Sequence, residues 1–244
     1  MALVAVVVAV IGTRPPAPPA DDATILTVNG ESVPFEEMKI FLEQNRAAVA
    51  ADYRTKVNVG GDKFWTTSVN GTTPQAELLT RATEQVVRQS IQFQLAASHK
   101  LIRDPTFLSF DEQWTSENMR RRQALSTGTP IYGPQQYSQA NYLAYLTGNI
   151  AQTLQDAMVA DGTIIVTDDE MRTYYDAHRS EFSPAGQAGP AADNFQDASD
   201  VIRKTLIAQS YDAVVSAREG SATVTSDPSL RLISASGCLA SGQC

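Results

Sequence analysis

Apolar side chains recur at intervals of three and four residues over most of this chain, which is the spacing of helices with one buried face. The stretches are bounded by Gly, Pro or capping residues, which commonly mark where helices start and stop. The stretch beginning near residue 75 has two apolar faces, which predicts a central, buried helix. The pattern predicts six helices, over about residues 34–60, 75–101, 109 to before 128, 138–160, 167–182 and 193–219.

Capping residues define several of these starts. Thr167 and Glu170 have the spacing of a capping box, in which each side chain bonds the main chain of the other residue. Ser109 and Glu112 have the same spacing and predict a second capping box. The last helix is expected to start at Asp193 or Asn194.

Two β-like segments flank the helices. The first is the β-branched run from Thr24, which ends at the turn signal Asn29-Gly30. The second is the "ATVTS" segment at residues 222–226. A lone strand leaves its backbone groups unpaired, so antiparallel pairing of the two segments is the expected solution. The predicted fold class is therefore mainly α, with short strands at both ends.

Net charge restricts the partners. The formal charge is −8, and the only basic run, residues 120–122, follows Glu117 on a predicted helix and is interpreted as a solvated face. A nucleic-acid-binding domain would show a basic surface, so no nucleic-acid partner is expected.

The N-terminus suggests export. Residues 2–11 form an apolar run that is too short to span a bilayer, but has the length of a signal-peptide core. A Pro-rich spacer follows, so residues 1–22 are interpreted as a truncated signal or anchor that could tether the protein to a membrane. A buried core strand is the alternative.

The cysteines lie together near the C-terminus. Cys238 and Cys244 could close a small disulfide loop, as expected in an oxidising compartment, or could remain idle thiols. Residues 227–244 are rich in Ser and Gly and are predicted to form a flexible tail. No cysteine and histidine cluster suggests a metal site.

Several motifs resemble a known family. A strand with "VNG" followed by "VPF" at a helix start, "VTDDEMRTYYDAHRSEF" and "FQDASDVIRKTLIAQSYDAVVSAREGSATV" occur in the order found in SurA and PrsA-type foldases. The resemblance implies a SurA-N-like helical chaperone domain over residues 23–226. In that family a parvulin-type prolyl isomerase domain is inserted at the position of residues 183–194. This short segment cannot hold such a domain, which needs on the order of 50 residues.

Candidate chemistry is sparse. The family's isomerase site uses paired histidines, and the two histidines here, His99 and His178, have no partner that the sequence can place. Nucleotide-binding, nucleophile-elbow and metal-helix motifs are missing from the sequence. No catalytic residue, metal or cofactor is therefore predicted, and no enzymatic activity is expected.

Aromatic residues suggest binding instead. Tyrosine rings with polar tips and deformable methionines suit the binding of varied peptides. The expected function is an ATP-independent extracytoplasmic chaperone for unfolded or nascent exported polypeptides. A dedicated assembly factor for one envelope partner and a relic prolyl isomerase are the alternatives. The candidate peptide-binding residues are Phe64, Trp65, Trp114, Met119, Tyr137, Tyr142 and Tyr145.

Overall fold

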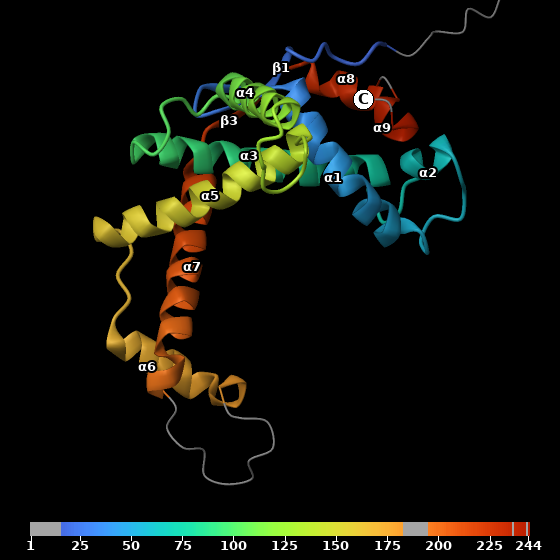
Figure 1. Cartoon of the computed structure of the whole chain (residues 1–244). Helices are drawn as coiled ribbons and strands as arrows, with labels where there is room; N and C mark the ends of the chain where they lie inside the picture. Colours follow the sequence, from blue (N-terminus) through green and yellow to red (C-terminus); the bar gives the residue numbers. More distant parts are fainter. Residues whose placement is uncertain (1–15, 183–194, 236, 243) are drawn as a thin grey trace, which may run out of the picture. The chain divides into compact units, whose positions relative to one another are not determined.

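The computed structural model describes residues 16–182, 195–235, 237–242 and 244. These residues form a mainly helical protein with a small antiparallel sheet, as the hydrophobic pattern predicts (Figure 1). Of residues 1–22, interpreted as a signal or anchor with its spacer, residues 1–15 lie outside the described residues. Residues 183–194, interpreted as the site of a missing domain, also lie outside them.

The chain divides into two compact units. Unit 1 contains residues 1–26, 34–82 and 226–244, and unit 2 contains residues 27–33 and 83–225. The predicted domain of residues 23–226 includes parts of both units, and the described residues that follow it belong to unit 1.

The sheet has the strand order β2-β1-β3, and all three strands contribute residues to both units. The predicted pairing of the two terminal segments is confirmed, because β1 (Thr24–Val28) lies beside β3 (Val224–Ser226). Asn29 and Gly30 both have positive φ, as expected for the tight turn that leads from β1 to β2 (Glu31–Pro34). The sequence analysis missed β2 because it assigned Pro34 to the start of a helix.

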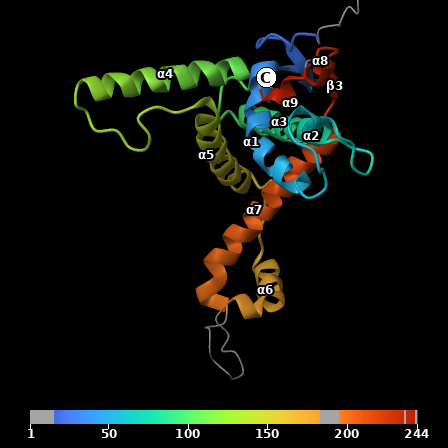
Figure 2. The same ribbon diagram turned by 90° about the vertical axis from the view of Figure 1, so that its right-hand side faces the viewer.

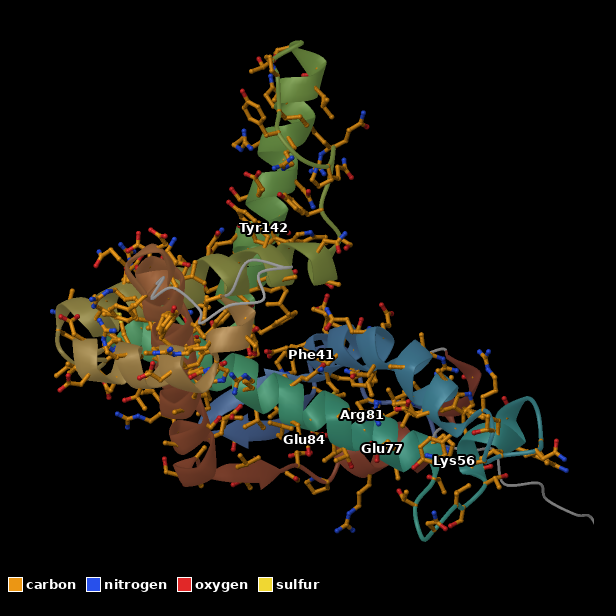
Figure 3. All side chains as sticks on the ribbon, turned by 90° about the horizontal axis from the view of Figure 1, so that it is seen from below. Phe41, Lys56, Glu77, Arg81, Glu84 and Tyr142 are labelled. Carbon is orange, nitrogen blue, oxygen red and sulfur yellow. A yellow bond between two sulfur atoms is a disulfide. The ribbon has the colours of Figure 1, made fainter. Side chains whose placement is uncertain are left out.

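Unit 1 is built around α1 (Phe35–Tyr53), which buries Phe35, Met38 and Val49. The short helix α2 (Asp62–Thr66) and the first residues of α3 (Pro74–Ser98) belong to the same unit. Figure 3 shows Glu77 and Arg81 on α3, where Arg81 bonds Glu77 at 2.7 Å and Asp52 of α1 at 2.9 Å.

The prediction of a flexible tail is wrong. Residues 227–244 contain α8 (Leu230–Ala235) and α9 (Cys238–Ser241), and the side chains of Ile233 and Leu239 are buried. A disulfide joins Cys238 to Cys244, which resolves the choice between a bridge and idle thiols. Composition suggested flexibility, but the bridge restrains the chain and the apolar residues of these short helices pack into unit 1.

Unit 2 holds the remaining long helices. The C-terminal half of α7 (Phe195–Ser221) is tied to α3, because Arg88 bonds Asp212 at 2.6 Å and Gln92 bonds the hydroxyl of Tyr211 at 3.0 Å. The other helices of unit 2 are α4 (Phe107–Ser126), α5 (Gln139–Ala160), α6 (Asp168–Ala177) and the 3-10 helix η1 (Arg179–Glu181).

Helix starts agree with the capping prediction in one case and disagree in another. The capping box at Thr167 is complete, with Glu170 N donating to Thr167 Oγ1 at 3.2 Å and Thr167 N donating to the Glu170 carboxylate at 2.8 Å. The predicted box at Ser109 is wrong. The helix α4 starts at Phe107, and Thr106 caps it by accepting a hydrogen bond from the main-chain N–H of Ser109. The hydroxyl of Thr106, another favoured N-cap residue, therefore takes the role that was predicted for Ser109.

The helices on either side of residues 183–194 pack together. The helix α6 lies against the N-terminal half of α7, as Figure 1 shows. Met171 and Tyr175 of α6 form a buried cluster with Ala198 and Ile202 of α7, and Phe182 packs against this cluster. The flanking segments therefore belong to one helical body, which the interpretation of residues 183–194 required.

Candidate polypeptide-binding site

The predicted binding residues fall into two groups, one in each unit. Phe64 and Trp65 lie on α2 in unit 1. The other group, in unit 2, lies on α4, on α5 and on the segment between these helices, and consists of Trp114, Met119, Tyr137, Tyr142 and Tyr145.

In unit 1, Arg46, Trp65 and α9 form what we name the covered cluster. Trp65 is buried, and the guanidinium of Arg46 lies 4.3 Å from the centre of its ring. Arg46 also donates hydrogen bonds to the main-chain carbonyls of Leu239 and, at 3.0 Å, Ala240. Phe64, half-buried, contacts Trp65 edge to face. The helix α9 packs against α2, and its carbonyls accept hydrogen bonds from the guanidinium that covers Trp65.

In unit 2, Trp114, Tyr137, Tyr142 and Tyr145 form what we name the open cluster. Tyr137 stacks on Tyr145 with ring centres 5.8 Å apart, and Tyr142 lies 5.6 Å from Tyr137. Tyr145 remains 53% exposed, which leaves an aromatic face accessible to a ligand.

Tyr142 anchors the open cluster rather than presenting a free ring. It is buried where α5 meets α4, and its ring packs against Phe110 (Figure 3). Burial raises the pKa of its hydroxyl, and the nearby carboxylate of Glu117 raises it further. Its contribution to a binding surface is therefore to hold Tyr137 and Tyr145 in place.

Met119 does not share the helix face of Trp114. The face of α4 that meets the connecting segment contains Trp114, Asn118 and Arg121, at the three- and four-residue spacing of one helical stripe. Met119 is 52% exposed, one position beyond that stripe. It is available to a ligand from an adjoining face of α4.

Sequence reasoning missed Asn118 and Arg121. The basic run at residues 120–122 was predicted to be solvated, which is wrong for Arg121, because this residue is only 5% exposed. It bonds Glu117 at 2.8 Å and places its guanidinium 4.4 Å from the centre of the Tyr137 ring. The stripe that continues from Phe110 and Trp114 to positions 118 and 121 was the available signal.

The segment between α4 and α5 returns along α4 (Figure 2). We name residues 129–137 the returning segment. Arg121 donates to the main-chain carbonyls of Tyr132, at 3.0 Å, and of Pro134. Trp114 Nε1 and Asn118 Nδ2 both donate to the carbonyl of Tyr137, at 2.8 and 2.9 Å. Side chains of α4 thus hold this segment chiefly by its main chain.

The two histidines have separate partners. His99 Nδ1 lies 3.3 Å from a carboxylate oxygen of Asp161. His178 Nδ1 lies 2.8 Å from the carbonyl oxygen of Tyr174 and its ring stacks on that tyrosine. Each histidine therefore has a local structural contact that needs no catalytic role.

In the part of the chain that the structure describes, no group of three or more His, Cys, Asp or Glu is arranged to hold a metal ion. In the same residues, no helix has both the length and the apolar content needed to cross a membrane.

No protein-family model, curated protein or solved structure matches this chain.

Proposed function

We propose that this protein is an exported, ATP-independent chaperone that holds unfolded or partly folded polypeptides and does not isomerise prolyl bonds. The observation that carries the proposal is the open cluster. Tyr145 is 53% exposed and Met119 is 52% exposed, so this part of unit 2 offers aromatic and apolar groups to solvent.

The chemistry of this surface suits ligands of varied sequence. Aromatic rings supply large contact area at little cost in side-chain entropy, and methionine adapts to irregular shapes. Leu108, which is 69% exposed, and Leu125, which is 43% exposed, add further apolar groups on α4. A surface of this kind binds many unfolded segments weakly, and weakly bound clients leave without a nucleotide cycle.

Two further observations support the proposal. The helix α6 packs against α7, so the segments on either side of residues 183–194, where the resembling family inserts its isomerase domain, belong to one helical body. The disulfide between Cys238 and Cys244 suits an oxidising compartment outside the cytoplasm. A membrane tether through residues 2–11 is part of the proposal as one way to retain the protein in the cell envelope.

The test is suppression of aggregation of several unrelated, chemically unfolded clients. The native protein should suppress aggregation of most of them at stoichiometric amounts without ATP. Tyr145→Ser should reduce this activity several-fold. Ile165→Ser is the matched control, because Ile165 is 70% exposed in the same unit but lies between α5 and α6. It should leave suppression unchanged.

Two outcomes favour the alternatives. Suppression of no general client, combined with tight binding to a single envelope protein, would support a dedicated assembly factor. Turnover of proline bonds in a peptide isomerisation assay would support a relic prolyl isomerase and contradict the proposal.

A further inference from the structure

We infer that Trp114, Asn118 and Arg121 form a binding site for the main chain of an extended polypeptide, and that the returning segment occupies it as an internal client that an external one displaces. We name these three residues the main-chain clamp. The inference rests on the proposed function and assigns it a site and a regulating segment.

The clamp is a buried polar site. Arg121 and Asn118 are 5% and 6% exposed with the returning segment in place. Glu117 bonds the guanidinium of Arg121 at 2.8 Å, which fixes its direction and balances its charge. Buried groups of this kind need partners, because an unsatisfied one costs roughly 1–3 kcal/mol.

The partners that the clamp takes are main-chain atoms. Asn118 forms a two-way pair with one residue, donating to Tyr137 O at 2.9 Å and accepting from Tyr137 N at 2.8 Å. This is the pairing that a neighbouring β-strand residue would offer. The side chains of Asn118, Trp114 and Arg121 therefore bind main-chain carbonyl and amide groups, which every polypeptide carries.

The side chains of the returning segment contribute little to this recognition. Tyr132 is held by its carbonyl while it is 93% exposed. Tyr137 is the exception, because its ring stacks on Tyr145 and lies against the guanidinium of Arg121. The site should therefore accept segments of varied sequence that end in an aromatic residue and have a glycine at the position of Gly133, where φ is +79°.

The tethering of the returning segment gives it an advantage over clients. A covalently linked segment competes at an effective concentration in the millimolar range for a short flexible linker. Weak or folded ligands would not displace it, whereas a long unfolded chain that also contacts Tyr145 and Met119 would. The segment thus sets a threshold for client binding.

The first experiment opens the site in the full-length protein. Residues 129–137 are replaced by a glycine–serine repeat of equal length, and a dye-labelled peptide of sequence TPIYGPQQY is titrated while its anisotropy is measured. The opened variant should bind this peptide at least tenfold more tightly than the native protein. In the opened variant, Asn118→Asp should weaken binding about tenfold. The control is Ser116→Ala on the same helix, whose side chain is exposed off the clamp face, and it should change binding less than twofold.

Two modified peptides test whether the clamp recognises the main chain or the side chains of its ligand. A peptide N-methylated at its final tyrosine lacks only the main-chain donor that meets Asn118, and should bind about tenfold more weakly. A shuffled peptide that keeps the glycine at its position and the final tyrosine should bind within about threefold of the original. The opposite ranking would overturn the inference, as would an opened variant that keeps its helical circular dichroism and does not bind the peptide.

A second measurement applies if the opened variant fails to fold. Excess peptide added to the native protein should accelerate amide hydrogen exchange in residues 129–137, and unchanged exchange at millimolar peptide would overturn the inference. Different outcomes would contradict the chaperone proposal and the clamp inference. Peptide binding without suppression of client aggregation would contradict the chaperone proposal, whereas suppression unaffected by Asn118→Asp would contradict the clamp alone.

Discussion

The covered cluster in unit 1 and the open cluster in unit 2 use the same combination of groups. In each, an arginine lies over an aromatic ring, at 4.3 Å for Arg46 on Trp65 and at 4.4 Å for Arg121 on Tyr137. Each arginine also donates to main-chain carbonyls. Arg46 bonds a carbonyl of α9, which is distant in sequence, and Arg121 bonds a carbonyl of the returning segment.

The difference lies in what holds the segment. A disulfide closes the loop that contains α9, and its buried Leu239 anchors it in unit 1. The returning segment follows α4 without a cross-link among the described residues, and Tyr145 beside it stays half exposed. On the inference above, the covered cluster is a permanent structural contact and the open cluster is a contact that a client can replace. Aromatic content alone would not distinguish the two.

A rise in pH from about 4.5 to 8 should weaken unit 1 more than any other single change. Burial raises the pKa of Glu37 on α1 from 4.5 to about 8. Between these two pKa values the folded state holds a proton that the unfolded state has released. The contribution of Glu37 to the free energy of unfolding is therefore fully present below pH 4.5 and is lost as pH rises through 8. At about 1.4 kcal/mol per pH unit, the loss is on the order of 5 kcal/mol.

The matched variant is Glu37→Gln, which keeps the shape of the side chain and removes its titration. Urea unfolding at several pH values between 5 and 9 should show a steep fall in stability for the native protein and a much flatter profile for the variant. Parallel profiles for the two proteins would show that Glu37 does not carry this pH dependence.

Removal of the clamp arginine should cost nearly as much. Arg121→Ala leaves Glu117 and two carbonyls without a buried partner, which is expected to cost about 3 kcal/mol. Arg120→Ala is the control, because Arg120 bonds the same carboxylate at 2.7 Å while its side chain is 60% exposed. Exposed pairs contribute only about 0–1 kcal/mol, so chemical denaturation should separate the two variants clearly.

These two arginines also show the limit of the sequence analysis. The helices were predicted because a single periodicity fixes which positions are apolar, and the complete capping box at Thr167 follows from local hydrogen bonds. Neighbouring arginines at 120 and 121 look alike in sequence. Only the path of the returning segment, which is set by tertiary packing, buries one and leaves the other in solvent.

The folded C-terminus was missed for a related reason. Small polar residues around Cys238 indicated a flexible tail. Local composition does not show whether another part of the chain offers a surface against which such residues can pack. That surface is provided by Arg46 and Trp65, and Arg46 bonds the carbonyl of Ala240, which lies 194 residues later in the chain. Long-range contacts of this kind have no local signature.

Loss of the disulfide should loosen the covered cluster. The chain-entropy model gives about 2 kcal/mol for a loop as short as that between Cys238 and Cys244, which are 6 residues apart. The double variant Cys238→Ser, Cys244→Ser should therefore unfold at lower urea concentration and should make Trp65 more accessible to iodide quenching. A variant with unchanged quenching would show that the bridge does not hold α9 over the ring.

The smallest effect concerns the close approach of Gly242 to Arg46. A Cβ at this position would lie 3.1 Å from Nη2 of Arg46, and the residue has φ of +73°. Gly128→Ala is the matched control, because Gly128 has φ of +69° with open space around it. Alanine in the left-handed conformation should lower the free energy of unfolding by about 1 kcal/mol in both variants. The contact with Arg46 should lower it further for Gly242→Ala, and thermal unfolding measures the difference. Equal losses would contradict the tight contact.

Amide hydrogen exchange of the native protein, with and without a saturating unfolded client, tests the central claim most directly. Client binding should change exchange in residues 107–150, which contain the open cluster and the main-chain clamp, and leave residues 62–66 and 238–241 unchanged. Protection confined to the covered cluster, or no change anywhere in residues 107–150, would contradict the account.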